Sequence, residues 1–160
     1  MVRLRKATVA DVPQMIDLMR PHITAERLLP RSHRDVAERL RDYVLATVDG
    51  RVIGLASVSL VDTHLAEVGA LTTDESCADH SAEGLLLDAV LDEVRSMGVE
   101  RVFVMTDDGS AFTSRGFIET SLEALPEKRD RQCLRCPRLP RCRQAAFELH
   151  LGHSGVAEAK

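Results

Sequence analysis

The sequence contains no apolar run that approaches the length of a membrane-spanning helix, for which about 20 consecutive apolar residues are needed. Residues 1–6 also lack the apolar segment of a signal peptide. From these two absences we expect a cytoplasmic, bacterial-type protein with no membrane partner.

Positive charge is not in excess either. Lys and Arg number 21 and Asp and Glu 25, a formal net charge of −4 at pH 7, so no general attraction to nucleic acid is expected. With 160 residues, 44% hydrophobic and 29% charged, the composition is that of one ordinary globular domain. We place that domain at residues 1–151, including a cysteine-rich loop at 130–143, and expect residues 152–160 to form a disordered tail.

Cysteine is scarce, but three of the four cysteines lie close together: Cys133, Cys136 and Cys142. Thiolates at such spacing can hold a structural zinc ion, with Cys77, a histidine or water as fourth ligand. An iron–sulfur site, free cysteines or one reversible disulfide are the alternatives. Several arginines surround the cluster, and their charge is expected to lower the thiol pKa values.

Alternation of apolar and polar residues, together with short apolar runs, predicts the strands. They are expected at residues 2–5, 43–48, 52–60, 66–72, 102–105 and 144–151. The first strand should be half-buried. Asp49-Gly50 is a hairpin turn signal between the second and third strands.

Capping signals and a 3.6-residue period predict the first two helices. Thr8 and Asp11 form an acidic capping box before a helix that should end near Pro21. Ser32 repeats the signal, and the second helix should bury Val36, Leu40 and Tyr43.

Two more helices follow by the same reasoning. The longer one should be capped by Ser81 or His80 and stopped by Gly98. Its expected inner face comprises Leu85, Leu86, Val90, Val94 and Met97. A short helix at residues 110–115 should end at Gly116.

The predicted order is strand, two helices, three strands, helix, strand, short helix, strand. This order resembles the GCN5-related N-acetyltransferase (GNAT) superfamily. Motifs at 28–32, 66–68, 102–106, 115–117 and 125–128 are similar to the acetyltransferase domain of N-acetylglutamate synthases. The cysteine cluster resembles their short single-domain bacterial versions. The resemblance implies an α/β (α+β) fold with a mixed, mostly antiparallel sheet splayed in the middle and helices on both faces.

The resemblance also implies which residues carry acetyl transfer. The family's pantetheine slot corresponds to Gly69, Ala70, Leu71 and Thr72, and the Leu71 amide would polarise the thioester carbonyl. Glu67 is the candidate base, since a protonated amine must lose a proton before it attacks. A plain core strand and a salt-bridged Glu67 are the alternatives.

The loop expected to hold the pyrophosphate of acetyl-CoA departs from the family's basic, glycine-rich pattern. It comprises Ala78, Asp79, His80, Ser81, Ala82, Glu83 and Gly84. Ala78 replaces a cation and Glu83 a glycine, and two acids now lie where phosphate should bind. Asp79 and Glu83 could instead satisfy the helix N-terminus themselves.

The acceptor side is expected to use cations and hydroxyls. By resemblance, Arg31 would bind an acceptor carboxylate, Ser32 would add a hydroxyl or cap the second helix, and Thr106 would also contact the acceptor. Asp107 and Asp108 follow Thr106 and disfavour an acidic acceptor.

The departing thiolate poses a separate question. Many GNAT enzymes reprotonate it with a tyrosine on the short helix, where this chain has Thr113 after Phe112. The single tyrosine, Tyr43, lies far away in the sequence.

Two classes of function follow. The first is an N-acetyltransferase that moves acetyl from acetyl-CoA to a small amine, such as L-glutamate in arginine biosynthesis, or to a different amine. The second is a weakly active or non-catalytic GNAT-fold protein that acts as a binding or regulatory module. As in many GNAT proteins, a homodimer is possible in either case.

Overall fold

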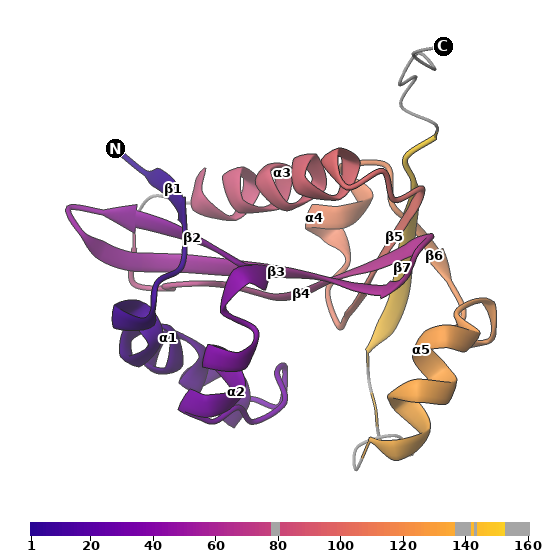
Figure 1. Ribbon diagram of the computed structural model, residues 1–160, viewed down its shortest axis with the longest axis horizontal. Helices are drawn as coiled ribbons and strands as arrows, with labels where there is room; N and C mark the ends of the chain where they lie inside the picture. Colours follow the sequence, from indigo (N-terminus) through magenta and orange to yellow (C-terminus); the bar gives the residue numbers. More distant parts are fainter. Residues whose placement is uncertain (78–80, 137–141, 143, 153–160) are drawn as a thin grey trace. The chain divides into compact units, whose positions relative to one another are not determined.

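The computed structural model describes residues 1–77, 81–136, 142 and 144–152 (Figure 1). Its strands are β1 (Arg3–Lys6), β2 (Tyr43–Val48), β3 (Arg51–Asp62), β4 (Leu65–Thr73), β5 (Arg101–Thr106), β6 (Ile118–Thr120) and β7 (Ala145–His150). Its α-helices are α1 (Val12–Thr24), α2 (His33–Glu38), α3 (Ser81–Ser96), α4 (Ser110–Thr113) and α5 (Pro126–Arg131). Short 3-10 helices are η1 (Val9–Asp11), η2 (Leu40–Asp42), η3 (Leu122–Ala124) and η4 (Cys133–Arg135).

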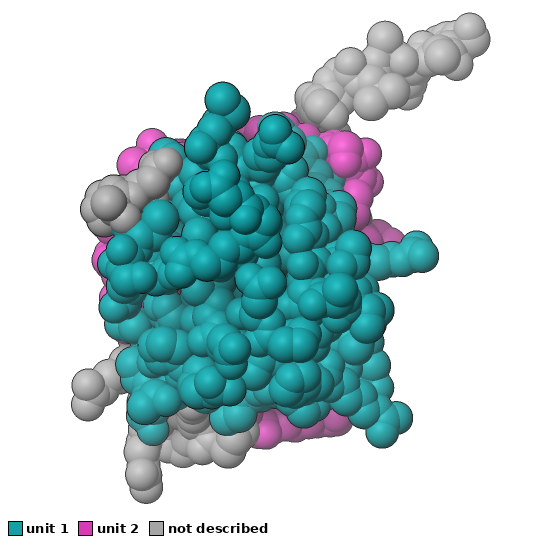
Figure 2. Space-filling view, turned by 90° about the vertical axis from the view of Figure 1, so that its left-hand side faces the viewer, with its two compact units in different colours: residues 1–58, 68–93 teal, residues 59–67, 94–160 magenta. Residues whose placement is uncertain are grey.

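The chain forms two compact units, which Figure 2 shows in separate colours. The first comprises residues 1–58 and 68–93, and the second comprises residues 59–67 and 94–160. The predicted single domain at 1–151 remains a prediction. Residues 153–160 of the predicted tail lie outside the described part of the chain.

The first unit is a sheet with helices on both faces. Its strands follow the order β1-β2-β3-β4, with β1 and β3 antiparallel to β2. The turn between β2 and β3 has positive φ at both Asp49 (48°) and Gly50 (79°), as predicted for this hairpin. Helices α1 and α2 lie on one face and α3 on the other (Figure 1). The core under α1 and α2 includes Met15, Met19, Val36, Tyr43, Leu55 and Ala70.

Both predicted capping boxes in this unit are confirmed. At the first, Asp11 accepts from the Thr8 N–H (2.8 Å) and hydroxyl (3.0 Å). Asp11 also receives two hydrogen bonds of 2.7 Å from Arg5 on β1. This one carboxylate therefore joins the edge strand to the start of α1.

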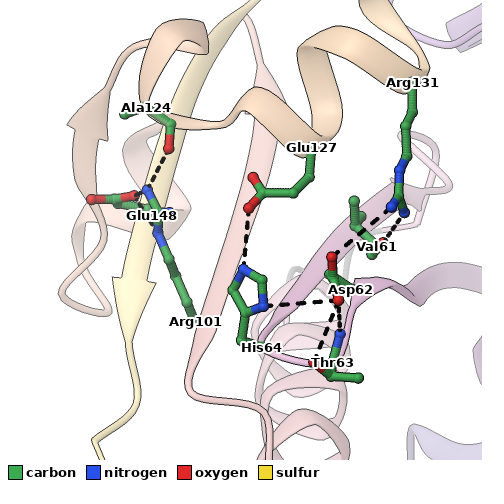
Figure 3. Close-up of polar contacts among 9 residues, drawn as sticks. All are labelled: Val61, Asp62, Thr63, His64, Arg101, Ala124, Glu127, Arg131 and Glu148. Carbon is green, nitrogen blue, oxygen red and sulfur yellow. Dashed lines mark hydrogen bonds and ion pairs between the residues drawn. The ribbon is translucent and has the colours of Figure 1, made fainter.

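The second unit contains the antiparallel order β5-β7-β6. Leu65, Phe103, Leu125 and Ala146 form its buried core. Arg101 on β5 donates to the carboxylate of Glu148 on β7 and, at 3.0 Å, to the Ala124 carbonyl in η3 (Figure 3). Arg101 therefore attaches the segment before α5 to the strands.

Four features of the predicted elements are corrected. All four residues of β1 are exposed, because β1 is an edge strand that pairs with β2 alone. Helix α1 continues three residues past Pro21. Proline removes only the hydrogen bond of its own missing N–H, and the Ala25 N–H still donates to the Pro21 carbonyl at 3.0 Å. Helix α2 ends at Glu38, so Leu40 lies in η2 and Tyr43 begins β2.

The burial pattern of α3 is the fourth correction. Leu85 and Met97, predicted to be internal, are 39% and 43% exposed. Leu86, Val90 and Val94 are buried as predicted, and the helix also buries Leu87 and Leu91. Gly98 follows the helix at φ 75°, as predicted for its stop. Strand β6 and helix α5 were not predicted at all.

Candidate functional site

Strand β4 carries a strained residue in the predicted pantetheine slot. Ala70 has φ 51° and is 5% exposed, although only glycine enters this region readily. A left-handed residue inside a strand changes the direction of the neighbouring backbone N–H and C=O groups, as at a β-bulge. Strain of this kind is concentrated at functional sites. The predicted oxyanion amide, that of Leu71, comes directly after this residue.

Thr72 adds a second anomaly in the same strand. It is 2% exposed, and its hydroxyl has no hydrogen-bond partner in the described part of the chain. Leaving a buried hydroxyl unsatisfied costs about 1–3 kcal/mol. A ligand that supplies a partner would recover that cost, so this side chain fits a binding slot better than a plain core strand.

The backbone of β3 approaches this slot closely. A Cβ atom on Gly54 would lie 2.9 Å from Leu86 Cδ1 and 3.3 Å from the Thr72 carbonyl oxygen. A Cβ on Gly69 would lie 3.1 Å from the Ser57 hydroxyl. Glycine at these positions therefore allows β3, β4 and α3 to pack around Thr72.

The predicted pyrophosphate loop is only partly described. Ala78, Asp79 and His80 lie outside the described residues. Ser81 begins α3, Ala82 is buried, and Glu83 is an exposed acid in the first helical turn. A carboxylate there stabilises the positive end of the helix dipole, which is the alternative role predicted for Glu83. Gly84 lies inside the helix.

The candidate base Glu67 is ion-paired. Lys128 Nζ on α5 lies 2.9 Å from Glu67 Oε1 and 3.1 Å from Oε2, and both side chains are about 85% buried (15% and 14% exposed). Gln132 also accepts from the same ammonium group. An ammonium group therefore occupies the position at which Glu67 would receive a proton from an acceptor amine.

Helix α5, which carries Lys128, is attached to the turn between β3 and β4 (Figure 3). His64 in this turn lies 3.1 Å from Glu127 and 3.9 Å from Asp62. Arg131 donates to the Val61 carbonyl at 2.8 Å. These contacts hold α5, and with it Lys128, against the turn that lies three residues before Glu67.

Arg31 presents a cation without a counter-ion. Arg31 is half-buried as a residue, and no carboxylate of the described residues lies within ion-pair distance. Nη1 donates to the Tyr43 hydroxyl at 2.9 Å and to Met19 Sδ at 3.9 Å. The nearby Asp35 is engaged with Ser32, whose hydroxyl accepts from the Asp35 N–H at 3.1 Å. Ser32 therefore caps α2, and its predicted contact with an acceptor remains untested.

Thr106 and the acids after it form a local turn. The Thr106 hydroxyl donates to the Asp108 carbonyl and accepts from the Asp108 N–H, both at 3.1 Å. The Asp108 carboxylate accepts from the Ser110 N–H at 3.0 Å, and this hydrogen bond lowers the pKa of Asp108. One of the two acids that disfavour an acidic acceptor thus stabilises the start of α4.

Thr113 does not replace the missing tyrosine. Its hydroxyl donates to the Ser110 carbonyl at 3.1 Å, so its proton already has an acceptor. The single tyrosine, Tyr43, accepts a hydrogen bond from Arg31 in the first unit. The described residues of α4 therefore offer no acidic hydroxyl for a thiolate.

The cysteine cluster receives no support as a zinc site. All four cysteines are free, and the described residues, which include Cys133, Cys136 and Cys142, contain no group of three or more metal-ligating side chains. Burial raises the pKa of the Cys133 thiol, contrary to the lowering expected from the neighbouring arginines. That reversal arises because the desolvation of half-buried Cys133 outweighs the opposite effect of the nearby Lys128 charge on the thiol pKa.

Comparison with known proteins identifies the family. Residues 13–121 match the model of the acetyltransferase (GNAT) family, well over half of the chain. The chain belongs to the GNAT acetyltransferase family. The resemblance predicted from the sequence is confirmed, and the activity at the family level is that of an N-acetyltransferase that uses acetyl-CoA.

Among curated proteins, this GNAT chain is 28% identical over 144 residues to an uncharacterised N-acetyltransferase of Chlorobaculum tepidum, covering 90% of the chain and 93% of the relative. It is 31% identical over 130 residues to the amino-acid acetyltransferase of Mannheimia succiniciproducens, covering 79% of the chain and 30% of that relative. A Pasteurella multocida amino-acid acetyltransferase is 28% identical, with 29% of its length covered. The GNAT chain thus spans less than a third of these amino-acid acetyltransferases.

Solved structures support the fold. N-acetylglutamate synthase from Neisseria gonorrhoeae, complexed with coenzyme A and N-acetylglutamate, has a TM-score of 0.84 at 24% identity, covering 94% of this chain and 35% of that one. Rv2747 from Mycobacterium tuberculosis, also complexed with CoA, has a TM-score of 0.79 at 21% identity, covering 93% and 99%. The predicted GNAT fold class is confirmed. In the described residues, no helix is long and apolar enough to cross a membrane.

Sequence reasoning missed two residues of the site. Lys128 lies in the quoted 125–128 motif, but nothing in the spacing of that motif pairs it with Glu67. Tyr43 lies far from the short helix in the sequence, and its hydrogen bond to Arg31 was not predicted. The signal available for Tyr43 was that it is the only tyrosine and begins a buried strand.

Proposed function

We propose that this GNAT N-acetyltransferase acetylates the amine of a small carboxylate-bearing acceptor, an amino acid such as L-glutamate. The observation that carries the proposal is half-buried Arg31, whose guanidinium has no counter-ion among the described residues. Buried charges are normally paired, and an arginine fork matches a carboxylate. An acceptor carboxylate would provide the missing anion.

The residues of β4 fit the cofactor that the family uses. Bound acetyl-CoA supplies the thioester whose acetyl group is transferred. Strain at Ala70 would orient the Leu71 N–H towards the thioester carbonyl, where a hydrogen bond to developing negative charge lowers the barrier. The buried Thr72 hydroxyl would find its partner in the same slot.

Proton removal is assigned to Glu67, directly or through water. For Glu67 to act as a base, the acceptor amine or a bridging water must reach its carboxylate, so Lys128 must release at least one of the two Glu67 oxygens that it now contacts. The Thr113 hydroxyl already donates to the Ser110 carbonyl, and α4 carries no tyrosine, so coenzyme A would leave as the thiolate or take a proton from water.

The choice of glutamate rests on likeness to proteins named amino-acid acetyltransferase and N-acetylglutamate synthase. This substrate would place the enzyme in arginine biosynthesis and in the cytoplasm. A homodimer remains a prediction, and light scattering of the purified protein tests it. Zinc is not part of the proposal.

The direct test is an acetyl-transfer assay over a panel of amino acids, with acetylated product detected by mass spectrometry. Thiol-reactive dyes are unsuitable because the four cysteines are free. Replacing Arg31 with alanine should raise the KM for L-glutamate at least tenfold, since a charged hydrogen bond contributes about 1.5–3 kcal/mol. An unchanged KM removes glutamate as the acceptor.

A second candidate is a GNAT-fold binding protein with little or no activity. Three observations favour it. An acid, Glu83, lies in the first turn of α3, and the Lys128 ammonium is paired with Glu67. The Thr113 hydroxyl already donates to a backbone carbonyl. Calorimetry with acetyl-CoA separates the two. If millimolar acetyl-CoA produces no heat of binding, the second candidate is supported and the acetyltransferase proposal is rejected.

A further inference from the structure

Tyr43 and Arg31 form an isolated polar pair inside the first unit. Tyr43, the first residue of β2, is 2% exposed and belongs to the core beneath α1 and α2. Its hydroxyl accepts a 2.9 Å hydrogen bond from Arg31 Nη1, and Arg31 directly precedes the cap residue of α2. The pair therefore joins the segment before α2 to the sheet.

The hydrogen bond uses only one edge of the guanidinium. Arginine carries five N–H donors in a fixed planar fork, and among the described residues only Nη1 makes a contact, to Tyr43 and to Met19. A long arginine side chain is otherwise flexible, and its rotamer freedom opposes binding. A hydrogen bond to a rigid buried phenol restrains Nη1, while Nε and Nη2, which have no partner among the described residues, are left for an anion.

The Tyr43 hydroxyl has no other partner that would explain its burial. It accepts from Arg31, and no described residue accepts its own proton. The pKa of Asp35 is lowered first by its hydrogen bonds to Ser32 and to a smaller extent by the Arg31 charge. Asp35 is held by the capping box of α2 and forms no ion pair with Arg31. A structural ion pair is therefore not the reason for this arrangement.

We propose that Tyr43 is a positioning residue that orients Arg31 towards the carboxylate of the acceptor, and so sets the preference of the enzyme for carboxylate-bearing amines. This inference rests on the proposed function of Arg31. It adds the residue on which that function depends.

The kinetic test compares Tyr43→Phe with wild type on L-glutamate and on its dimethyl ester, which keeps the amine but lacks both carboxylates. We expect the KM for glutamate to rise about tenfold while kcat changes less than twofold, because a hydrogen bond to a charged group is lost. The KM for the ester should not change. Thr47→Val, which removes another buried hydroxyl of β2 (6% exposed), is the matched control and should alter neither KM.

A second readout does not depend on catalysis. The chain has one tyrosine and no tryptophan, so its ultraviolet fluorescence reports on Tyr43 alone. Glutamate should change this fluorescence saturably in the wild type, the dimethyl ester should not, and Arg31→Ala should abolish the response.

The outcomes separate the two claims. If glutamate changes the fluorescence but no acetylated product forms, the carboxylate site stands and the proposed function fails. If glutamate is acetylated but Tyr43→Phe leaves its KM unchanged, or raises the KM for the ester equally, the inference is overturned. Absence of both the fluorescence response and acetylation overturns both.

Discussion

Glu67 and Lys128 share one carboxylate–ammonium contact, with both oxygens of Glu67 within 3.1 Å of Nζ. This contact allows two roles for Glu67, as a base or as the counter-ion of Lys128. Replacing Glu67 with glutamine alone would not separate them, because it leaves Lys128 buried without a counter-ion, which by itself is destabilising.

The double variant E67Q/K128Q separates the roles. It removes both charges and keeps a polar pair of similar size. We expect its kcat to fall about 100-fold, because general base catalysis typically contributes that much or more. Steady-state kinetics at saturating acetyl-CoA measures this, with circular dichroism as the check on folding. A double variant with wild-type kcat would show that Glu67 is a counter-ion only.

Thr72 yields a prediction in which stability and binding change in opposite directions. Thr72→Val removes a buried hydroxyl that has no described partner. The free energy of unfolding of the ligand-free protein should therefore be unchanged or rise by up to about 1 kcal/mol. Affinity for acetyl-CoA should fall, because the ligand loses its partner. Differential scanning calorimetry and titration calorimetry measure the two effects.

Thr47→Val is the control for this substitution, since the Thr47 hydroxyl already donates to the Arg3 carbonyl at 3.5 Å. It should lower stability slightly and leave acetyl-CoA affinity unchanged. If Thr72→Val behaves like this control, the Thr72 hydroxyl is not part of the cofactor slot.

At the scale of elements, the start of α1 depends on one carboxylate. The guanidinium of Arg5 holds the pKa of Asp11 well below its usual range, so Asp11 is ionised in the folded protein at pH values where the unfolded chain is partly protonated. The resulting stabilisation is complete above the unfolded pKa of about 4 and is lost as the pH falls below it.

Asp11→Asn should therefore lower the free energy of unfolding by about 1–2 kcal/mol at pH 7, at the low end for a charged contact because Arg5 is 41% exposed. The difference from wild type should shrink as the pH falls from about 5 to 2. Urea denaturation at several pH values measures it. Asp17→Asn, in an exposed pair with Arg20, should have no effect, and a pH-independent deficit in Asp11→Asn would contradict the account.

The elements predicted from the sequence are those with strong local signals. The Asp49-Gly50 turn, the two capping boxes and the Gly98 stop are each determined by a few neighbouring residues, and all were found. Helix α5 was missed because its residues, Pro126 to Arg131, have no apolar period, and polar contacts to the β3–β4 turn hold it in place. Such contacts are not readable from local sequence.

The same distinction holds for the candidate site. Motif order predicts that Gly69 to Thr72 lie in a strand and that Ser81 begins a helix, and they do so in β4 and α3; their contact with a cofactor stays a prediction. The positive φ of Ala70 and the unpartnered Thr72 hydroxyl could not be predicted, because both depend on how β4 packs. The Arg31–Tyr43 hydrogen bond could not be predicted either, because it depends on where β2 places Tyr43 in the folded sheet.

At the scale of the whole molecule, the family is shown while the acceptor is proposed. The GNAT match covers residues 13–121, and likeness to N-acetylglutamate synthase reaches a TM-score of 0.84 at 24% identity, which supports the fold rather than the substrate. The proposal of a carboxylate-bearing acceptor therefore depends on Arg31 and its surroundings, and it can be tested directly on this chain.

The most direct measurement is acetyl transfer from acetyl-CoA to L-glutamate by the intact protein, followed by mass spectrometry of the product. We expect time-dependent formation of N-acetylglutamate that requires the enzyme and is reduced at least tenfold at low substrate in Arg31→Ala. Faster acetylation of amines that lack a carboxylate, or no product with any amine despite bound acetyl-CoA, would contradict it.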